Sequence, residues 1–241
     1  MRKTVIALST AALLAAGSFA AEHKEVHWDY DVHGPSHWGE FGETCAKGTA
    51  QSPINIVTTQ TSSIHPAKAM TLSHDVQTKG SVVDNGHAIQ VNIDNGGKLS
   101  VEGDDYKLLQ FHFHGKSEEM IDGKQYDLVA HMVHKSDEGN LAVVAVLFQE
   151  GETANKMVQQ VIEHVGKPID INPADLLPKQ ADHYFHFTGS LTTPPCSENV
   201  KWYVMKEIQS ATKEQVAAMR KFYANNYRPV QPLNGRTIES K

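Results

Sequence analysis

The sequence predicts a mainly β protein, a single domain built on mostly antiparallel strands with short helices at its periphery. Three observations support this fold class. Runs of β-branched or alternating residues recur along the chain, turn signals such as Asn85-Gly86 and Asp122-Gly123 separate them, and helical periodicity is confined to short pieces. No internal repeat or Gly/Ser linker divides the chain.

The strands and helices follow from these patterns in chain order. Most of the strand runs lie between residues 81 and 148, and helical periodicity appears after them. Thr212 is a suitable N-cap for the second helix because its hydroxyl can accept from a free N–H of the first turn. We expect strands at Ser81–Val83, Ala88–Ile93, Lys98–Val101, Tyr106–His114, Leu128–His134, Leu141–Phe148 and Val200–Met205, and helices at Ala154–His164 and Thr212–Ala224.

The N-terminus has the features of a secretory signal peptide. Arg2 and Lys3 precede a short apolar run, and small residues before and at Ala20 suit signal peptidase. We expect residues 1–20 to be the signal peptide and 21–241 the domain. The apolar run is too short for a comfortable transmembrane span. The sequence therefore predicts an exported protein without a membrane partner, periplasmic in a Gram-negative source and extracellular otherwise.

Net charge argues against a polyanionic partner. The chain has 22 basic and 28 acidic residues, and loss of Arg2 and Lys3 with the signal peptide leaves 20 against 28, a net charge of −8. This balance disfavours nucleic acid and anionic membranes. We expect a small-molecule substrate. The sequence does not decide between a monomer and a homodimer.

The chain contains two cysteines, Cys45 and Cys196. An exported protein with two cysteines usually pairs them, so we expect a disulfide between them. Two free thiols are the alternative. Because Cys196 follows Thr192-Thr193-Pro194-Pro195, a disulfide would also fix that loop.

Three histidines in β-favouring stretches indicate a metal site. Side chains alternate along a strand, so His112 and His114 point to the same face, and an adjacent strand can bring His131 beside them. Three neutral imidazoles leave a fourth zinc position open, which is typical of a catalytic zinc. Chance is the alternative, because the chain has 14 histidines. Burial of three imidazoles without a ligand would be costly, which favours the metal site.

An ordered set of short motifs resembles that of the alpha-class carbonic anhydrases, in their exported bacterial branch. The motifs extend over residues 26–236, nearly all of the mature chain. Each motif alone is weak, but nine in the family's order are specific. They are His27-Trp28, Gly34-Pro35-Ser36-His37-Trp38, Gln51-Ser52-Pro53-Ile54, Asn85-Gly86-His87, Gln110 to His114, Ser117-Glu118, Ala130 to His134, Gly189 to Cys196 and Asn226-Tyr227-Arg228-Pro229.

The resemblance implies a fold, a reaction and a ligand set. The fold is a large twisted, mostly antiparallel sheet, and the reaction is the reversible hydration of carbon dioxide to bicarbonate and a proton by attack of a zinc hydroxide. The zinc ligands would be His112, His114 and His131. Thr192 would accept a hydrogen bond from the hydroxide and donate to a buried Glu118, which together orient the nucleophile.

The remaining family positions form a proton path and a substrate pocket. The resemblance makes His87 the proton shuttle, since a histidine titrates near neutrality. Thr193 would line the bicarbonate site. Beyond these, the family implies a polar wall of Tyr30, Asn85 and Gln90, an outer partner for His112 in Gln110, and an apolar pocket of Val133, Val143, Leu191, Val200 and Trp202.

Two positions depart from the family pattern. Glu119 stands where the family usually has histidine or asparagine, and Val129 stands where it usually has glutamate. On a strand, position 129 shares a face with His131, so the usual glutamate would orient that imidazole. Valine cannot, and we therefore expect His131 to lack a partner unless a water or a neighbouring carboxylate replaces it, with weaker zinc binding as the result.

Two other functions are compatible with the residues. A carbonic-anhydrase-like binding module without catalysis would be expected to have lost zinc ligands, and none is lost here. An unrelated H-x-H metalloprotein, such as a metal-dependent oxygenase, would prefer iron and would usually add a carboxylate ligand.

Overall fold

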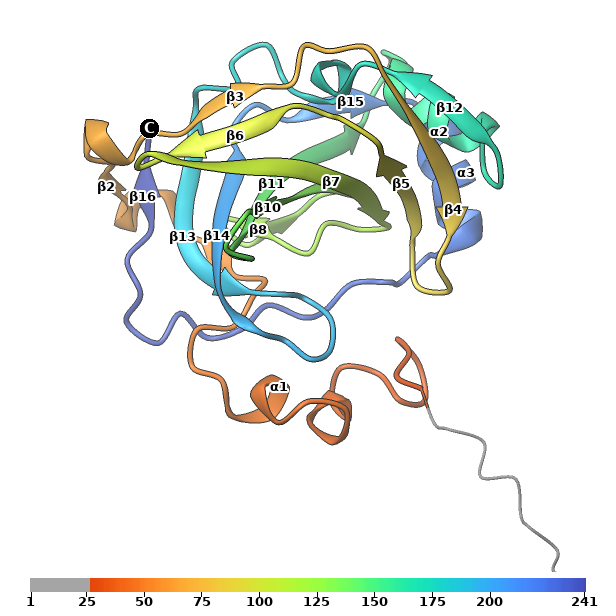
Figure 1. Ribbon diagram of the computed structural model, residues 1–241. Helices are drawn as coiled ribbons and strands as arrows, with labels where there is room; N and C mark the ends of the chain where they lie inside the picture. Colours follow the sequence, from red (N-terminus) through yellow and green to blue (C-terminus); the bar gives the residue numbers. More distant parts are fainter. Residues whose placement is uncertain (1–26) are drawn as a thin grey trace, which may run out of the picture.

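In the computed structural model, which describes residues 27–241, one large mixed sheet dominates the fold (Figure 1). Most neighbouring strands are antiparallel, but β11 pairs in parallel with β14 and with β15, and β16 pairs in parallel with β2. The predicted mainly β class is confirmed. In spatial order the strands are β12 (Pro168–Ile171), β4 (Thr78–Asp84), β5 (Ile89–Ile93), β7 (Asp104–His114), β10 (Leu128–Ser136), β11 (Leu141–Glu150), β14 (Glu198–Met205), β13 (Tyr184–Ser190), β16 (Glu239–Ser240) and β2 (Ser62–Ser63).

Shorter strands extend or flank this sheet. β15 (Gln209–Ala211) pairs with β11, and β6 (Lys98–Val101) pairs with both β7 and β3 (Thr71–Ser73). A separate small sheet contains β1 (Asn55–Ile56), β8 (Met120–Ile121) and β9 (Lys124–Gln125).

The helices are few and short. α2 (Lys156–Glu163) begins after the N-cap Asn155, and α3 (Lys213–Phe222) begins after Thr212. Thr212 and Gln215 form a capping box, which confirms the predicted N-cap. The others are α1 (Glu43–Lys47) and four 3₁₀ turns, η1 (Trp38–Glu40), η2 (Thr58–Gln60), η3 (Pro66–Lys68) and η4 (Pro173–Leu176).

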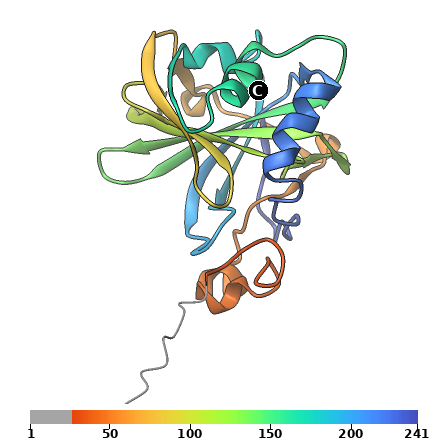
Figure 2. The same ribbon diagram turned by 90° about the vertical axis from the view of Figure 1, so that its right-hand side faces the viewer.

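The sheet separates two apolar clusters. Along β10 successive side chains alternate between them: Ala130 and Met132 belong to the larger cluster, which also contains the apolar faces of α2 and α3, whereas Val129 belongs to the smaller cluster on the opposite face. Figure 2 shows α3 lying across the strands on the helical side. His131 shares the face of Val129, so the three predicted ligands lie away from the helices.

Two further features of the chain bear on the predictions. A disulfide joins Cys45 in α1 to Cys196 in the loop between β13 and β14, as predicted. None of the helices in residues 27–241 combines the length and the apolar composition needed to cross a membrane. The predicted signal peptide, residues 1–20, lies outside the described residues.

Candidate metal centre

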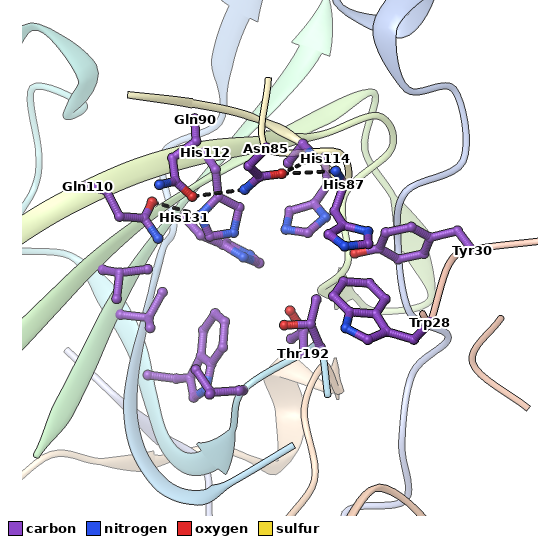
Figure 3. A pocket seen from close by; sticks show the side chains of 16 residues that line it. Trp28, Tyr30, Asn85, His87, Gln90, Gln110, His112, His114, His131 and Thr192 are labelled. Atoms are coloured by element: carbon purple, nitrogen blue, oxygen red, sulfur yellow. Dashed lines mark hydrogen bonds between the residues drawn. The ribbon is translucent and has the colours of Figure 1, made fainter. Parts of the chain in front are cut away.

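Adjacent strands bring the three predicted histidines together. His112 and His114 lie on β7, and His131 on the antiparallel neighbour β10 pairs directly with His112. One nitrogen of each ring lies within 4.8 Å of the corresponding nitrogen of the other two. Figure 3 shows the rings converging at one end of a cavity. The convergence predicted from the strand period is confirmed, and His112, His114 and His131 are the one such group among the described residues.

Hydrogen bonds on the outer nitrogens orient the two rings from β7. The Nδ1 of His112 lies 2.9 Å from Oε1 of Gln110, and the Nδ1 of His114 lies 2.5 Å from the carbonyl oxygen of Asn226. Since both partners are acceptors, each Nδ1 carries the hydrogen and each Nε2 keeps its lone pair. Gln110 lies beside His112, as the resemblance implies.

His131 does have a partner although Val129 cannot supply one, and of the two replacements considered it is a neighbouring carboxylate. The Nε2 of His131 lies 3.1 Å from Oε2 of Glu119, and both side chains are buried. Val129 itself packs in the smaller apolar cluster with no exposed surface. A neighbouring carboxylate has thus replaced the missing glutamate. The contact uses Nε2, so Nδ1 is the nitrogen of His131 that remains for a metal.

The donor set fits a zinc ion. Metal binding requires neutral imidazoles. Removal from bulk water, reinforced by His131, lowers the pKa of His112 to about 3, and burial lowers the pKa of His114 well below its ordinary value. The Nε2 of His114 is buried without a hydrogen-bond partner, a costly state that a metal ion would relieve. Three nitrogen ligands also match the composition of a catalytic zinc site.

Two carboxylates flank His131. Burial lowers the pKa of His131, but Glu119 and then Glu118 outweigh this effect, so the pKa is raised overall. Burial raises the pKa of Glu118 to about 7; His131, Thr192 and the backbone N–H of Arg228 oppose that rise, whereas Glu119 adds to it. Oε2 of Glu118 lies 3.8 Å from Nδ1 of His131, on the side of the ring that faces the other histidines.

Thr192 lies in the β13–β14 loop, where the chain is closely held. The loop follows Gly189 and Ser190 at the end of β13, whose backbone approaches Ser52; a Cβ on Gly189 would lie 2.1 Å from the Ser52 hydroxyl. At its other end Cys196 is fixed by the disulfide. Thr192 is buried, and a hydrogen bond from its side chain favours the ionised form of Glu118, which lowers the pKa of that carboxyl.

The histidines lie in a cavity of about 190 Å³. Its apolar wall consists of four predicted residues, Val133, Val143, Leu191 and Trp202, with Thr192 and Thr193 beside them. Val200 is not among the residues that line this cavity; its side chain is buried in the smaller apolar cluster.

The opposite wall of the cavity is polar (Figure 3). Tyr30, Asn85, His87 and Gln90 all line it, as the resemblance implies. The amide of Asn85 donates to Oε1 of Gln90 at 3.0 Å, and its own Oδ1 accepts from the backbone N–H of His87 at 2.9 Å. The hairpin between β4 and β5 therefore holds this wall in one hydrogen-bonded arrangement.

The structure adds residues that were not predicted to take part in the site. Trp28 lines the cavity and stacks on the ring of His87 with centroids 3.7 Å apart. Asn226 is buried; its carbonyl accepts from His114 and its amide donates to the carbonyl of His87 at 3.0 Å. Both occur in the quoted motifs, so the motifs were the signal that could have found them. Ala88 also lines the cavity.

Comparison with known proteins shows which family this chain resembles in sequence. The model of the eukaryotic-type carbonic anhydrase family matches residues 33–241. A carbonic anhydrase of Pectobacterium atrosepticum is 39% identical over 243 residues, covering 95% of this chain and 97% of the relative. A carbonic anhydrase of Neisseria gonorrhoeae is 38% identical over 253 residues, covering 98% of this chain and 97% of the relative.

Solved structures agree with the sequence relatives. The Photobacterium profundum alpha-carbonic anhydrase superposes with a TM-score of 0.81 at 44% identity, covering 88% of this chain and 99% of that one. An alpha-carbonic anhydrase from Thermovibrio ammonificans, solved with the inhibitor sulfanilamide, has a TM-score of 0.81 at 38% identity. The match covers 88% of this chain and 98% of that one. With the fold, the three-histidine centre and both comparisons in agreement, the chain belongs to the alpha-class carbonic anhydrases, a family of lyases.

Proposed function

We propose that this chain catalyses the reversible hydration of carbon dioxide to bicarbonate and a proton, with zinc held by Nε2 of His112, Nε2 of His114 and Nδ1 of His131. The observation that carries the proposal is the convergence of these three nitrogens in a cavity with one apolar and one polar wall. The chemistry that zinc supplies when bound is a nucleophile at neutral pH, because it lowers the pKa of its water to about 7, and carbonic anhydrase is the usual example of this effect.

Thr192 and Glu118 would orient the attacking group. The backbone N–H of Arg228 donates to Oε1 of Glu118 at 2.6 Å, which fixes the carboxylate in place. An ionised Glu118 only accepts hydrogen bonds, so the Thr192 hydroxyl would donate its one hydrogen to it and present only lone pairs to the cavity. In this arrangement Thr192 accepts from a group that carries a proton and disfavours one that does not.

The apolar wall would hold carbon dioxide beside the attacking group. Val133, Val143, Leu191 and Trp202 offer no hydrogen-bonding side-chain group to the cavity except the indole N–H of Trp202, and that donates to the carbonyl of Ser190 at 3.0 Å. Such a surface suits a nonpolar gas molecule and does not suit its charged product. Thr193, at the edge of this wall, would contact bicarbonate as it leaves.

His87 would carry the proton out of the cavity. Burial, with the nearby His27, lowers the pKa of His87 against the opposing effect of Asp29 and Asp84, so the ring is neutral at neutral pH and can accept a proton. It lies on the polar wall, at the hairpin between β4 and β5, where Trp28 stacks on it.

The His87→Ala variant should lower turnover in weak buffer while leaving carbon dioxide–bicarbonate exchange at equilibrium nearly unchanged, because only the export of the proton is impaired. Added imidazole should restore part of the rate. Stopped-flow hydration and isotope exchange measure the two quantities, with His37→Ala, an exposed histidine, as the control. An equal loss in both measurements would place His87 in the chemical step or in folding.

Zinc analysis and a hydration assay on the purified protein test the proposed function directly. Hydration with one zinc per chain supports it. Stoichiometric zinc without hydration would instead indicate a binding module that has kept the ligands. Family membership already excludes the unrelated H-x-H metalloprotein.

We also propose export, by a signal peptide at residues 1–20, to the periplasm of a Gram-negative cell or otherwise to the exterior. The disulfide between Cys45 and Cys196 supports this location, because disulfides persist in oxidising compartments. The acidic net charge supports a small-molecule substrate over nucleic acid.

Reduction of this disulfide should lower both the unfolding midpoint and the turnover. The two cysteines are 151 positions apart, and closing a loop of that length stabilises the fold by about 5 kcal/mol in the chain-entropy model. Turnover should fall too, because Cys196 follows Thr192 in the same loop. Thermal unfolding and hydration with and without reductant measure both effects, and unchanged turnover in the reduced, folded protein would show that the loop holds Thr192 without the disulfide.

A further inference from the structure

Glu119 is a buried carboxylate with one clear contact. Its Oε2 lies 3.1 Å from Nε2 of His131, and its Oε1 has no hydrogen-bond partner. The segment that carries it is well fixed: the Ser117 hydroxyl donates to the carbonyl of Glu119 at 2.8 Å and accepts from the backbone N–H of Tyr126 at 2.9 Å. The carboxylate therefore reaches the ring of His131 from a rigid loop that precedes β8.

Glu119 cannot share the metal with the histidines. It contacts the nitrogen of His131 that points away from His112 and His114, whereas Glu118 approaches from their side, with Oε2 at 3.5 Å from Nε2 of His114. The two adjacent glutamates thus contact opposite nitrogens of one imidazole. Glu119 acts on the ring, and any influence on a metal passes through His131.

Position 129 offers a second route to the same ring. Val129 lies two residues before His131 on β10, on the same face of the sheet, and pairs with His114 on one side and Leu147 on the other. The family pattern usually has its glutamate there, and histidine or asparagine at position 119. In this chain Val129 is fully buried among apolar residues, with no polar role.

We propose that Glu119 is the positioning residue of His131, and that Glu119 and Val129 form an exchanged pair, in which the carboxylate that orients the third ligand has moved from the strand to the loop. The two departures from the family pattern are then one compensated change. This inference rests on the proposed metal centre.

The physical basis is control of the imidazole tautomer. A neutral imidazole carries its hydrogen on either nitrogen, and only the form with hydrogen on Nε2 presents the Nδ1 lone pair to a metal. A carboxylate beside Nε2 selects that form, fixes the ring plane and makes the ligand more basic. A second carboxylate at position 129 would have no hydrogen to accept from this ring and would be buried unpaired, which destabilises a fold.

Four proteins test the proposal: wild type, Glu119→Leu, which removes the acceptor, Val129→Glu, and the double variant Glu119→Leu/Val129→Glu. Zinc retention is measured by competition with a chelator, the ring tautomer by ¹⁵N NMR of labelled histidine, and folding by the unfolding midpoint of the zinc-free protein. Asp122→Asn, an exposed carboxylate three residues from Glu119, is the matched control.

Glu119→Leu should weaken zinc retention about 10- to 100-fold, the usual effect of losing an outer partner of a ligating histidine, and should shift the His131 signals toward a mixture of tautomers. Val129→Glu alone should not strengthen zinc retention and should lower the unfolding midpoint. The double variant should recover retention to near the wild-type value, which a merely structural role of Glu119 would not produce.

Retention equal to wild type in a folded Glu119→Leu protein would overturn the proposal, as would a folded double variant that stays as weak as the single one. Should the double variant not fold, the Glu119→Leu protein decides alone: unchanged His131 signals refute the positioning role. If the wild-type protein binds zinc but does not hydrate carbon dioxide, the proposed function fails. Zinc retention and the His131 tautomer in the four proteins would still test the positioning role of Glu119.

Discussion

Replacement of His114 by alanine should remove most of the bound zinc and reduce carbon dioxide hydration by more than about 100-fold, beyond the loss that follows from removing an outer partner of a ligand. His114 is buried, its Nδ1 is fixed by the carbonyl of Asn226, and its Nε2 has no hydrogen-bond partner. Its loss therefore removes a pre-oriented ligand. The fold should persist, because the neighbouring β7 and β10 pairing is made by the backbone.

Zinc per chain, hydration rate and the unfolding midpoint check this expectation together. His183→Ala, at an exposed histidine outside the cavity, is the control and should keep both zinc and rate. A folded His114→Ala protein with stoichiometric zinc and near-normal rate would remove His114 from the metal centre.

Much of the metal centre could be predicted because it depends on the strand period. His112 and His114 must share a face whatever the tertiary structure, and β-favouring neighbours on both sides of His131 indicate a second strand. The pairing of His131 with His112 across β7 and β10 required only that these two strands be neighbours. The strand period and the sheet topology place the same three histidines together, so the ligand set could be predicted from the sequence.

The outer partners of the ligands were less predictable, for a physical reason. Gln110 is two residues from His112 on the same strand and shares its face, so its contact follows from the period. Asn226 accepts a hydrogen bond from His114 through its backbone carbonyl, and because every residue has such a carbonyl, the residue type does not predict this contact. Glu119 comes from a loop, where side-chain direction has no fixed period, and its carboxylate therefore went unassigned to His131.

Other differences concern the bounds of the strands and which of their side chains line the cavity. The predicted strand Tyr106–His114 is longer in the structure, Asp104–His114, while β13 at Tyr184–Ser190 was not predicted, although its aromatic and β-branched residues favour a strand. Val200 and Trp202 share a face of β14, yet of the two only Trp202 lines the cavity. The period gives the face of a strand but not the depth of a pocket.

Removal of the Thr192 hydroxyl should reduce turnover by about 100-fold without loss of zinc. A misorientation on the order of 1 Å in the attacking group can cost that much, even when every reacting atom is present. Thr192→Val keeps the shape of the side chain and removes both the donor to Glu118 and the acceptor that faces the cavity. Thr192→Ser keeps the hydroxyl and is the matched control, expected to stay close to wild type.

The comparison separates orientation from binding and from stability. Thr192 is not among the three metal-binding side chains, so zinc retention should be the same in both variants, and a buried valine should not lower the unfolding midpoint in a loop already fixed by Ser190 and Cys196. A difference in turnover alone then assigns the effect to the hydroxyl. Equal turnover in the valine and serine variants would mean that the Thr192–Glu118 pair does not orient the attacking group, and that the buried carboxylate serves only to receive the backbone N–H of Arg228.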